Sequence, residues 1–177
     1  MRLFVALDLP DSILQTLEAL LARLEPTARV HWSTAANLHI TTKFIGEFPE
    51  ERLQDLKQAL QSISRTNPIP IRVEGLGWFP NPHAPRVFWA GVRGGDALQK
   101  LAHETNQALA PLGVPEETRD FHPHLTLARI KDRVDLAPLR QAVAQLETVD
   151  FGPFEARSQF LYLSNNSVYT KLGEFFL

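Results

Sequence analysis

Residues 39–42 of this 177-residue chain read His-Ile-Thr-Thr, and residues 124–127 read His-Leu-Thr-Leu. Both stretches follow the pattern His-x-Thr-x, and the interpretation of the whole sequence starts from this pair. In an extended strand successive side chains point to opposite faces, so each copy places an imidazole and a hydroxyl on one face. If the fold brings the copies together, the space between them holds two groups that titrate near neutral pH and two hydroxyl donors.

The segments around the two copies also repeat, at nearly the same offset of 85 residues (124 minus 39). Alternating and helical apolar patterns predict the same order of elements in each half, β-α-β-α-β. The expected pairs are first strands at 3–7 and 88–92, first helices with apolar stripes at 13–24 and 98–112, second helices at 53–63 and 136–146, and third strands at about 69–79 and 154–164, with an extra strand at 168–176.

The stretch 80–85, Pro-Asn-Pro-His-Ala-Pro, marks the expected join between the halves, because proline excludes helix and disrupts sheet pairing. We therefore expect one bilobed domain over residues 1–177, with lobes at about 1–80 and 86–177. Side-chain identity between the halves is low outside the His-x-Thr copies. The alternative to a true pseudo-symmetry is a chance alternation of strands and helices.

The composition limits the class of protein. A hydrophobic content of 44% is enough for one buried core, and the absence of Cys excludes disulfides, thiolate nucleophiles and Cys-ligated zinc. The absence of Cys also fits a reducing compartment, so we expect a cytoplasmic protein. The apolar stretch 2–7 is too short for a signal peptide or a membrane span.

The net charge of −2 argues against a broad basic surface for long nucleic acids. A short polynucleotide end could still bind a local patch of basic residues. The candidates for this patch are Lys43, Arg86, Arg119, Arg129, Lys131 and Arg133. Residues 129–133 equally fit a solvated loop, and the loop is the favoured interpretation for Lys131 and Arg133.

Two imidazoles and two hydroxyls suit the hydrolysis of a phosphodiester. That reaction needs a base for the nucleophile, an acid for the leaving oxygen and donors for the non-bridging oxygens. His39 and His124 supply the first two, and Thr41 and Thr126 can donate hydrogen bonds to the phosphate. The reaction requires no metal and no nucleotide cofactor, so we expect neither. A site without a two-metal clamp suits a strained substrate, such as the 2′,3′-cyclic phosphate end of an RNA.

Longer stretches around both copies resemble the two-histidine phosphoesterases, and within them the bacterial RNA 2′,3′-cyclic phosphodiesterases, also called 2′-5′ RNA ligase-like proteins. The resemblance spans nearly the whole chain. It rests on Arg-Leu-Phe-Val-Ala-Leu at 2–7, Asn-Leu-His-Ile-Thr-Thr-Lys-Phe-Ile-Gly at 37–46, Pro-Arg-Val-Phe-Trp-Ala-Gly-Val at 85–92 and Phe-His-Pro-His-Leu-Thr-Leu-Ala-Arg at 121–129. Thr42, where Leu is common, and His122 depart from the family pattern.

The resemblance implies an α+β fold of two pseudo-symmetric lobes, each with an antiparallel sheet and helices outside, around a central cleft. It implies that His39 is the proton donor to the 3′ oxygen and that His124 is the base that activates water, which yields a 2′-phosphomonoester. The implied partners are RNAs with 2′,3′-cyclic phosphate ends, such as tRNA fragments, or else small cyclic nucleotides. The resemblance also implies reversible 2′-5′ RNA ligation in vitro, and no obligate protein partner is implied.

Two basic residues are further candidates for the phosphate. Arg129 could hold two oxygens at once through its guanidinium. Its odd spacing from His124 places it on the opposite face unless the strand ends or bulges near Ala128. Lys43 shares the parity of His39, so it either reaches toward the cleft mouth or is a solvated strand-end lysine.

Aromatic side chains could stack a terminal base, as single-stranded RNA recognition often requires. We expect most aromatic residues in the core, and Trp32, in a loop-like stretch before the first copy, is the best candidate. The set considered is Trp32, Phe44, Trp78, Trp89 and Tyr169.

Three alternatives remain open. His122 and His124 share a strand face at a spacing that metal sites use, with His39 as a third ligand, although neither copy contains Asp or Glu. The same residues would also suit an RNA-end or tRNA-binding protein without turnover. They would also suit a relative that acts on a small cyclic nucleotide or a nucleotide-sugar cyclic phosphate. The remaining histidines, at 31, 83 and 103, have no such context and are expected on the surface.

Overall fold

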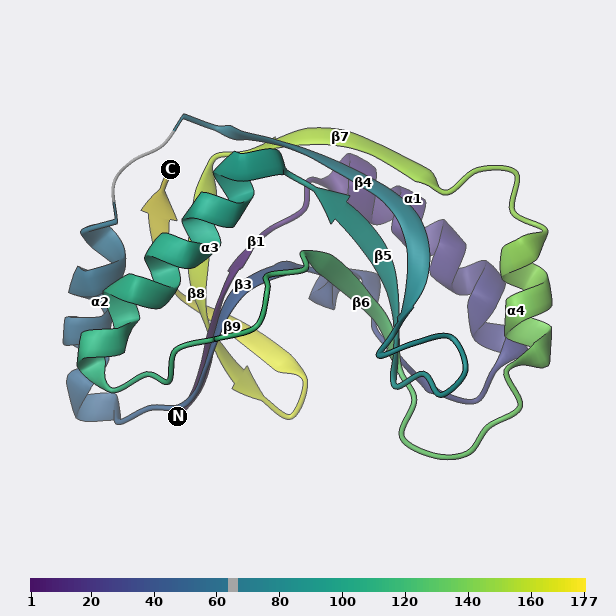
Figure 1. Cartoon of the computed structure of the whole chain (residues 1–177), viewed down its shortest axis with the longest axis horizontal. Helices are drawn as coiled ribbons and strands as arrows, with labels where there is room; N and C mark the ends of the chain where they lie inside the picture. Colours follow the sequence, from purple (N-terminus) through teal and green to yellow (C-terminus); the bar gives the residue numbers. More distant parts are fainter. Residues whose placement is uncertain (64–66) are drawn as a thin grey trace.

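The computed structural model describes residues 1–63 and 67–177, which form two antiparallel sheets with helices packed on their outer sides (Figure 1). The expected α+β class and the β-α-β-α-β order of each half are confirmed. The elements are β1 (Arg2–Leu7), α1 (Asp11–Leu24), β2 (His31–Trp32), β3 (Ile40–Glu47), α2 (Leu53–Gln61), β4 (Ile69–Phe79), β5 (Val87–Arg93), α3 (Gly95–Leu109), β6 (His124–Arg129), α4 (Ala137–Ala144), β7 (Asp150–Ala156), β8 (Ser158–Asn165) and β9 (Val168–Phe176).

Each sheet takes strands from both halves of the sequence. The strand orders are β3-β1-β8-β9 and β2-β6-β5-β4-β7, so the sheets do not coincide with the expected lobes 1–80 and 86–177. The segment 154–164, expected as one strand, is two strands, because the chain crosses between sheets at Arg157. β7 before this residue pairs with β4, and β8 after it pairs with β1. The two halves therefore exchange their third strands.

The helices bury one face of each sheet. α1 and α4 cover the five-stranded sheet, where Leu17 and Leu139 are fully buried in one cluster with Phe88 (Figure 1). On the four-stranded sheet, Leu56 of α2 joins a second cluster with Val5. Full burial of such a side chain stabilises the fold by about 1.5–3 kcal/mol. The opposite sheet faces are therefore the ones left for function.

β3 contains a bulge just after the first His-x-Thr copy. Ala6 of β1 pairs with Thr41, and Val5 pairs with Lys43, so Thr42 is an extra residue between the two pairs. A bulge reverses the alternation of side chains beyond it. Thr42 is buried and its hydroxyl donates to the Val5 carbonyl over 3.2 Å, so Thr in place of the family's usual Leu changes only local packing.

β6 contains the same bulge after the second copy. Trp89 of β5 pairs with Thr126, and Phe88 pairs with Ala128, which leaves Leu127 as the extra residue. By these pairings Trp89 in the second half is the structural equivalent of Ala6 in the first half. The first strands are therefore offset by 83 residues rather than by the expected 85. The pseudo-symmetry of the two halves thus extends to an irregularity of the backbone.

No helix in the described ranges is both long and apolar enough to span a bilayer.

Candidate active site

The strands that carry the two His-x-Thr copies lie in contact with each other (Figure 1). The short strand β2 pairs with β6, and the chain then leads directly toward β3. Ser33 fixes this path, because its backbone N–H donates to the Leu127 carbonyl over 2.9 Å and its hydroxyl donates to the Thr126 carbonyl over 2.7 Å. His39 and His124 are close enough that charge on His124 lowers the pKa of His39.

The two imidazoles are held in the same way. Nδ1 of His39 lies 2.7 Å from the Asn37 carbonyl oxygen, and Nδ1 of His124 lies 2.7 Å from the His122 carbonyl oxygen. A carbonyl can only accept a hydrogen bond, so Nδ1 carries the proton in both rings. The second nitrogen, Nε2, is then the atom of each ring that can exchange a proton with a substrate.

Aromatic rings fix the plane of each imidazole. Phe4 stacks on His39 with 4.7 Å between the ring centroids, and Tyr169 meets His39 edge-on at 5.3 Å. Phe79 meets His124 edge-on at 5.0 Å. Rings held in this way lose little further freedom when a substrate binds.

Burial lowers the pKa of both histidines. At His39 the Asn37 carbonyl and the Asp8 carboxylate oppose this effect, whereas Arg129 adds to it. At His124 the His122 carbonyl opposes it, and Arg129 and the His122 ring add to it. Both rings therefore favour the neutral form near pH 7 in the free protein, and an anionic substrate would favour the protonated form.

Thr41 and Thr126 lie on the same sheet faces as the histidines and are half-buried. In the part of the chain that the structure describes, neither hydroxyl has a protein hydrogen-bond partner. Both are therefore available as donors to a ligand between β3 and β6.

The bulge at Leu127 turns Arg129 toward the histidine face. Arg129 pairs with Val87, which has the same parity in β5 as Trp89, the partner of Thr126. Its side chain is exposed, and its charge lowers the pKa of both His39 and His124. The condition under which Arg129 could reach a phosphate, a bulge near Ala128, is therefore met.

The equivalent bulge turns Lys43 in the opposite direction, so both expectations for this residue were wrong. Lys43 is only 5% exposed. Its ammonium donates to the Pro115 carbonyl over 2.6 Å and to the side-chain oxygen of Asn106 in α3. Lys43 is thus a buried, hydrogen-bonded residue on the helix side of the sheet.

The basic patch expected from the sequence is correspondingly smaller. Arg119 is paired with Glu117. Arg86 donates to the Lys131 carbonyl over 3.0 Å, and Arg86 also neighbours Val87, the strand partner of Arg129. Among the six candidates for this patch, Arg129 is the residue whose charge acts on both histidines.

Trp32 lies on the wrong face to stack a substrate base, which corrects the sequence-based expectation. It pairs with Ala128, a core position, and its ring packs edge-on against the buried Phe88 at 6.2 Å. Its indole N–H donates to the Ala28 carbonyl over 3.0 Å. Phe44, by contrast, is 64% exposed on the His39 face, with its ring centroid 6.3 Å from that of Phe4.

Sequence reasoning missed Asp8. It follows β1 with the same parity as Phe4 and Ala6, so alternation could have placed it beside His39. Its carboxylate accepts a hydrogen bond from Tyr162 and forms an ion pair with Lys171.

The other histidines are exposed. His122 contributes its backbone carbonyl to the orientation of His124, while its side chain lies in solvent. His31, His83 and His103 are exposed, as the sequence suggested. Within 1–63 and 67–177, no three His, Cys, Asp or Glu side chains are grouped so that they could hold one metal ion.

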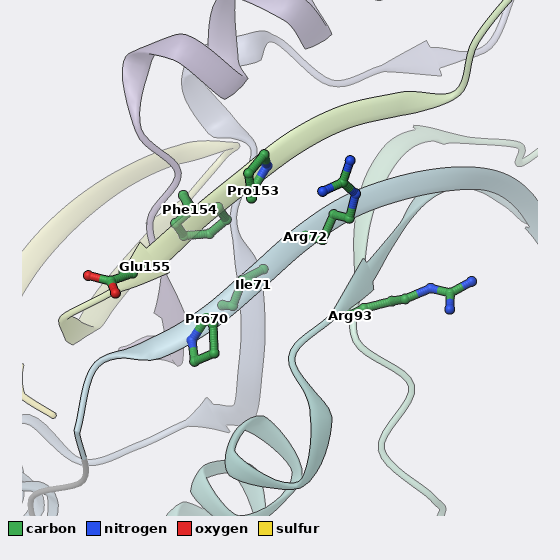
Figure 2. A pocket seen from close by; sticks show the side chains of 7 residues that line it. All are labelled: Pro70, Ile71, Arg72, Arg93, Pro153, Phe154 and Glu155. Atoms are coloured by element: carbon green, nitrogen blue, oxygen red, sulfur yellow. The ribbon is translucent and has the colours of Figure 1, made fainter.

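A separate open hollow of about 450 Å³ lies over β4 and β7 (Figure 2). Arg72 and Arg93 project beside it from neighbouring strands. Glu74 pairs with both guanidiniums and Asp150 with that of Arg72, so the charges at this hollow are balanced. A phosphate would gain little there, and we place the functional site at the histidines instead.

Comparison with known proteins identifies a family of phosphoesterases. The family described as LigT like phosphoesterase matches residues 7–89 and 92–164. Curated relatives include the RNA 2′,3′-cyclic phosphodiesterases of Archaeoglobus fulgidus, 37% identical over 89% of this chain and 87% of the relative, and of Methanocaldococcus jannaschii, 34% identical over 98% and 99%. Similar solved structures include TT0787 of Thermus thermophilus, with a TM-score of 0.84 at 29% identity over 100% of this chain and 98% of that one. Escherichia coli LigT in complex with 3′-AMP has a TM-score of 0.80 at 25% identity over 99% and 97%.

Proposed function

Because this chain belongs to the LigT-like phosphoesterase family, we propose that it hydrolyses the 2′,3′-cyclic phosphate ends of RNA with His39 and His124 as the two proton-transfer groups. The activity, RNA 2′,3′-cyclic phosphodiesterase, is the one for which its curated relatives are named. The observation that carries the assignment to these residues is the repeated arrangement of two imidazoles on contacting strands, each with Nδ1 bound by a backbone carbonyl.

In the proposed reaction a water molecule attacks phosphorus in line with the 3′ oxygen. Nε2 of His124 takes a proton from the water, the bond between phosphorus and O3′ breaks, and Nε2 of His39 gives a proton to O3′. The product is a 2′-phosphomonoester. The residues themselves supply both proton transfers, so the proposed mechanism uses no metal and no cofactor. With the 5′-hydroxyl of another RNA in place of water, the same groups would join two RNA ends through a 2′-5′ bond as the bond between phosphorus and O3′ breaks.

Three further residues are proposed to hold the phosphate. The Thr41 and Thr126 hydroxyls lie beside the two imidazoles, and Arg129 adds a guanidinium that can contact two oxygens. Donors at the non-bridging oxygens stabilise the charge that develops in the transition state. Phe44, exposed on the His39 face, is proposed to stack on the base of the terminal nucleotide.

We also propose that the protein is cytoplasmic and forms one bilobed domain over residues 1–177. The absence of cysteine supports a reducing compartment. The exchange of strands between the two halves supports a single folding unit. Its substrates would be RNA ends, including those of tRNA fragments, as well as small cyclic nucleotides.

The test is an assay of 2′,3′-cyclic mononucleotides and a cyclic-phosphate-ended oligonucleotide in excess chelator, with products identified by phosphorus NMR. Appearance of a 2′-phosphate supports the proposal. We expect His39→Ala and His124→Ala each to lower turnover by at least about 10²-fold, the scale for loss of a positioned proton donor or acceptor. His103→Ala, at an exposed position on α3, is the matched control and should retain wild-type turnover.

Other outcomes of the same assay would point elsewhere. Loss of activity with chelator would favour a metal site that includes His122. Tight binding of the oligonucleotide without product would favour an RNA-end binding protein. Hydrolysis of mononucleotides alone would favour a small cyclic nucleotide as substrate, and unchanged rates in both histidine variants would refute the mechanism.

A further inference from the structure

The residue opposite each histidine differs between the two halves. Gly91 of β5 pairs with His124. In the other half Leu7 pairs with Ile40, so the next pair in that register is Asp8 and His39. Directly opposed residues of antiparallel strands have Cβ atoms about 4.5–5.5 Å apart. His39 therefore faces a carboxylate at the position where His124 faces a glycine.

The packing of the sheet enforces this difference. A Cβ atom added at Gly91 would lie 2.4 Å from the backbone carbonyl oxygen of Glu74. Real Cβ atoms do not approach backbone that closely, so no side chain fits opposite His124 without movement of β4. The pseudo-symmetric frame thus has room for a carboxylate beside one histidine and not beside the other.

Two partners fix the Asp8 carboxylate. The Tyr162 hydroxyl donates to Oδ1, and the Lys171 ammonium lies against Oδ2. Lys171 is itself held 4.0 Å from the ring centroid of Phe160. Burial and the neighbouring Asp8 raise the pKa of Tyr162, which keeps its hydroxyl a donor. The carboxylate is therefore held in place by strands β8 and β9 rather than by a flexible loop.

The charges around His39 oppose one another. Burial lowers the pKa of His39, and so do Arg129 and His124 of β6, whereas the Asn37 carbonyl and Asp8 raise it. Of the groups that raise the pKa of His39, Asp8 is the carboxylate. The ion pair between Asp8 and Lys171 reduces this effect on the pKa. The titratable and charged groups that face His39, counting those that act through Asp8, are Asp8 after β1, His124 and Arg129 of β6, Tyr162 of β8, and Tyr169 and Lys171 of β9.

We propose that Asp8 is a positioning residue of the reaction, which acts through His39 and lets this imidazole, rather than His124, carry the proton that the leaving oxygen takes. The proposal rests on the phosphodiesterase activity proposed above. The two His-x-Thr copies are equivalent in backbone and in tautomer, so neither copy alone determines which ring is the acid. The carboxylate opposite one of them distinguishes the two.

The proton balance shows why the difference matters. His39 begins hydrolysis as an imidazolium and ends neutral after protonating O3′, while His124 begins neutral and ends protonated after accepting a proton from water. Exchange with solvent restores both rings. Arg129 disfavours positive charge on both rings, so the starting state needs a group that offsets this effect at His39, and Asp8 is placed to do so.

The test compares the pH dependence of kcat/KM in the wild type, Asp8→Asn and Lys171→Met. The limb at high pH reports loss of the proton from the acid of the free enzyme. An opposite charge within about 4–6 Å changes a pKa by about 1–3 units, and because Lys171 and solvent screen Asp8 we expect Asp8→Asn to move this limb to lower pH by about 0.5–1 unit. Lys171→Met removes the cation that pairs with Asp8 and leaves the hydrogen bond from Tyr162, so it should move the same limb to higher pH.

A histidine NMR titration of the same proteins, assigned with His39→Gln, tests the proposal without turnover. We expect the midpoint of His39 to fall in Asp8→Asn and to rise in Lys171→Met, and that of His124 to stay in place. An inactive wild type in which these midpoints move would reject the proposed function and retain the influence of Asp8. Unchanged His39 midpoints, or shifts of the same sign in both variants, would show that Asp8 only supports the fold and would overturn the proposal.

Discussion

Phe44 and Arg129 occupy equivalent positions in the two halves. Each lies two residues beyond the bulge, at Thr42 in β3 and at Leu127 in β6, and each side chain is exposed on the face of a histidine. The shared backbone thus presents an aromatic ring beside His39 and a guanidinium on the other strand. A terminal nucleotide has a base at one end and a phosphate at the other, which matches this division.

Removal of the Arg129 guanidinium should slow the chemical step. We expect Arg129→Met to lower kcat by about 10²-fold or more, the scale for loss of one donor to a developing oxyanion. Arg129→Lys keeps the charge and loses the two-pronged geometry, so it should fall between the wild type and Arg129→Met. Steady-state kinetics on a cyclic mononucleotide measure the effect. A kcat for Arg129→Met within twofold of the wild type would remove Arg129 from the phosphate site.

Removal of the Phe44 ring should weaken substrate binding more than chemistry. Stacking of a base on an aromatic ring is worth about 1–3 kcal/mol, so Phe44→Ala should raise KM for a cyclic nucleotide by roughly 5-fold to 150-fold. Phe44→Tyr keeps the ring and should behave as the wild type. A ribose 2′,3′-cyclic phosphate without a base is the matched substrate. If Phe44→Ala raises KM equally for both substrates, the ring does not stack on the base.

Replacement of Lys43 should affect stability and leave chemistry unchanged. Lys43→Met retains the length of the side chain but removes two hydrogen bonds of the ammonium, and the Asn106 side-chain oxygen then keeps only the Glu117 backbone N–H as a donor. A hydrogen bond from a charged group contributes about 1.5–3 kcal/mol, so denaturant unfolding should show a loss of this order. The activity of the folded variant should match the wild type. A large fall in kcat without destabilisation would return Lys43 to the active site.

Acid should destabilise the protein between about pH 7.5 and pH 5.5, because burial lowers the pKa of His39 and His124 below the value of about 6.5 for an unfolded chain. As the pH falls through this window the unfolded state takes up protons before the folded state does, so the free energy of unfolding decreases. Hydrogen bonds with Arg119 lower the pKa of the Glu117 carboxyl to about 2, so Glu117 titrates below this window. Thermal unfolding at fixed ionic strength measures the trend.

The matched variant for this measurement is the double substitution His39→Gln and His124→Gln. It removes both buried imidazoles, so its unfolding temperature should depend less on pH across the same window. An equal slope in the wild type and the double variant would assign the acid sensitivity to other groups.

Apolar periodicity was sufficient to predict the regular elements. The expected helical stripe at 13–24 lies within α1, and the expected strand at 69–79 coincides with β4. The segment 154–164 was predicted incorrectly as one strand, because the alternation of exposed and buried side chains continues through the exposed Arg157 while the chain changes its strand partner. An alternation pattern reports how deeply each side chain lies, and it contains no information on which strand lies beside it.

The bulges explain most of the errors at the site. Residues 42–43 and 127–128 are consecutive buried positions, a pattern that a strand buried on both faces also shows. The sequence does not reveal which residues pair, so the prediction extends the alternation of side chains through each bulge. It therefore places Lys43 on the wrong face and leaves the face of Arg129 undecided. His39, Thr41, His124 and Thr126 precede the bulges, so their common faces could be predicted from spacing alone.

Because β4 and β8 are exchanged, each half depends on the other for a strand of its sheet. A cut within residues 80–85 would leave each fragment with a vacant slot in its sheet that only a strand of the other fragment fills. The fragments should therefore be incomplete singly and reassemble as a split enzyme when mixed. The spacing between the imidazoles is then set by backbone ladders shared between the halves, so a change of register at β4 or β8 would act on the histidine of the other half.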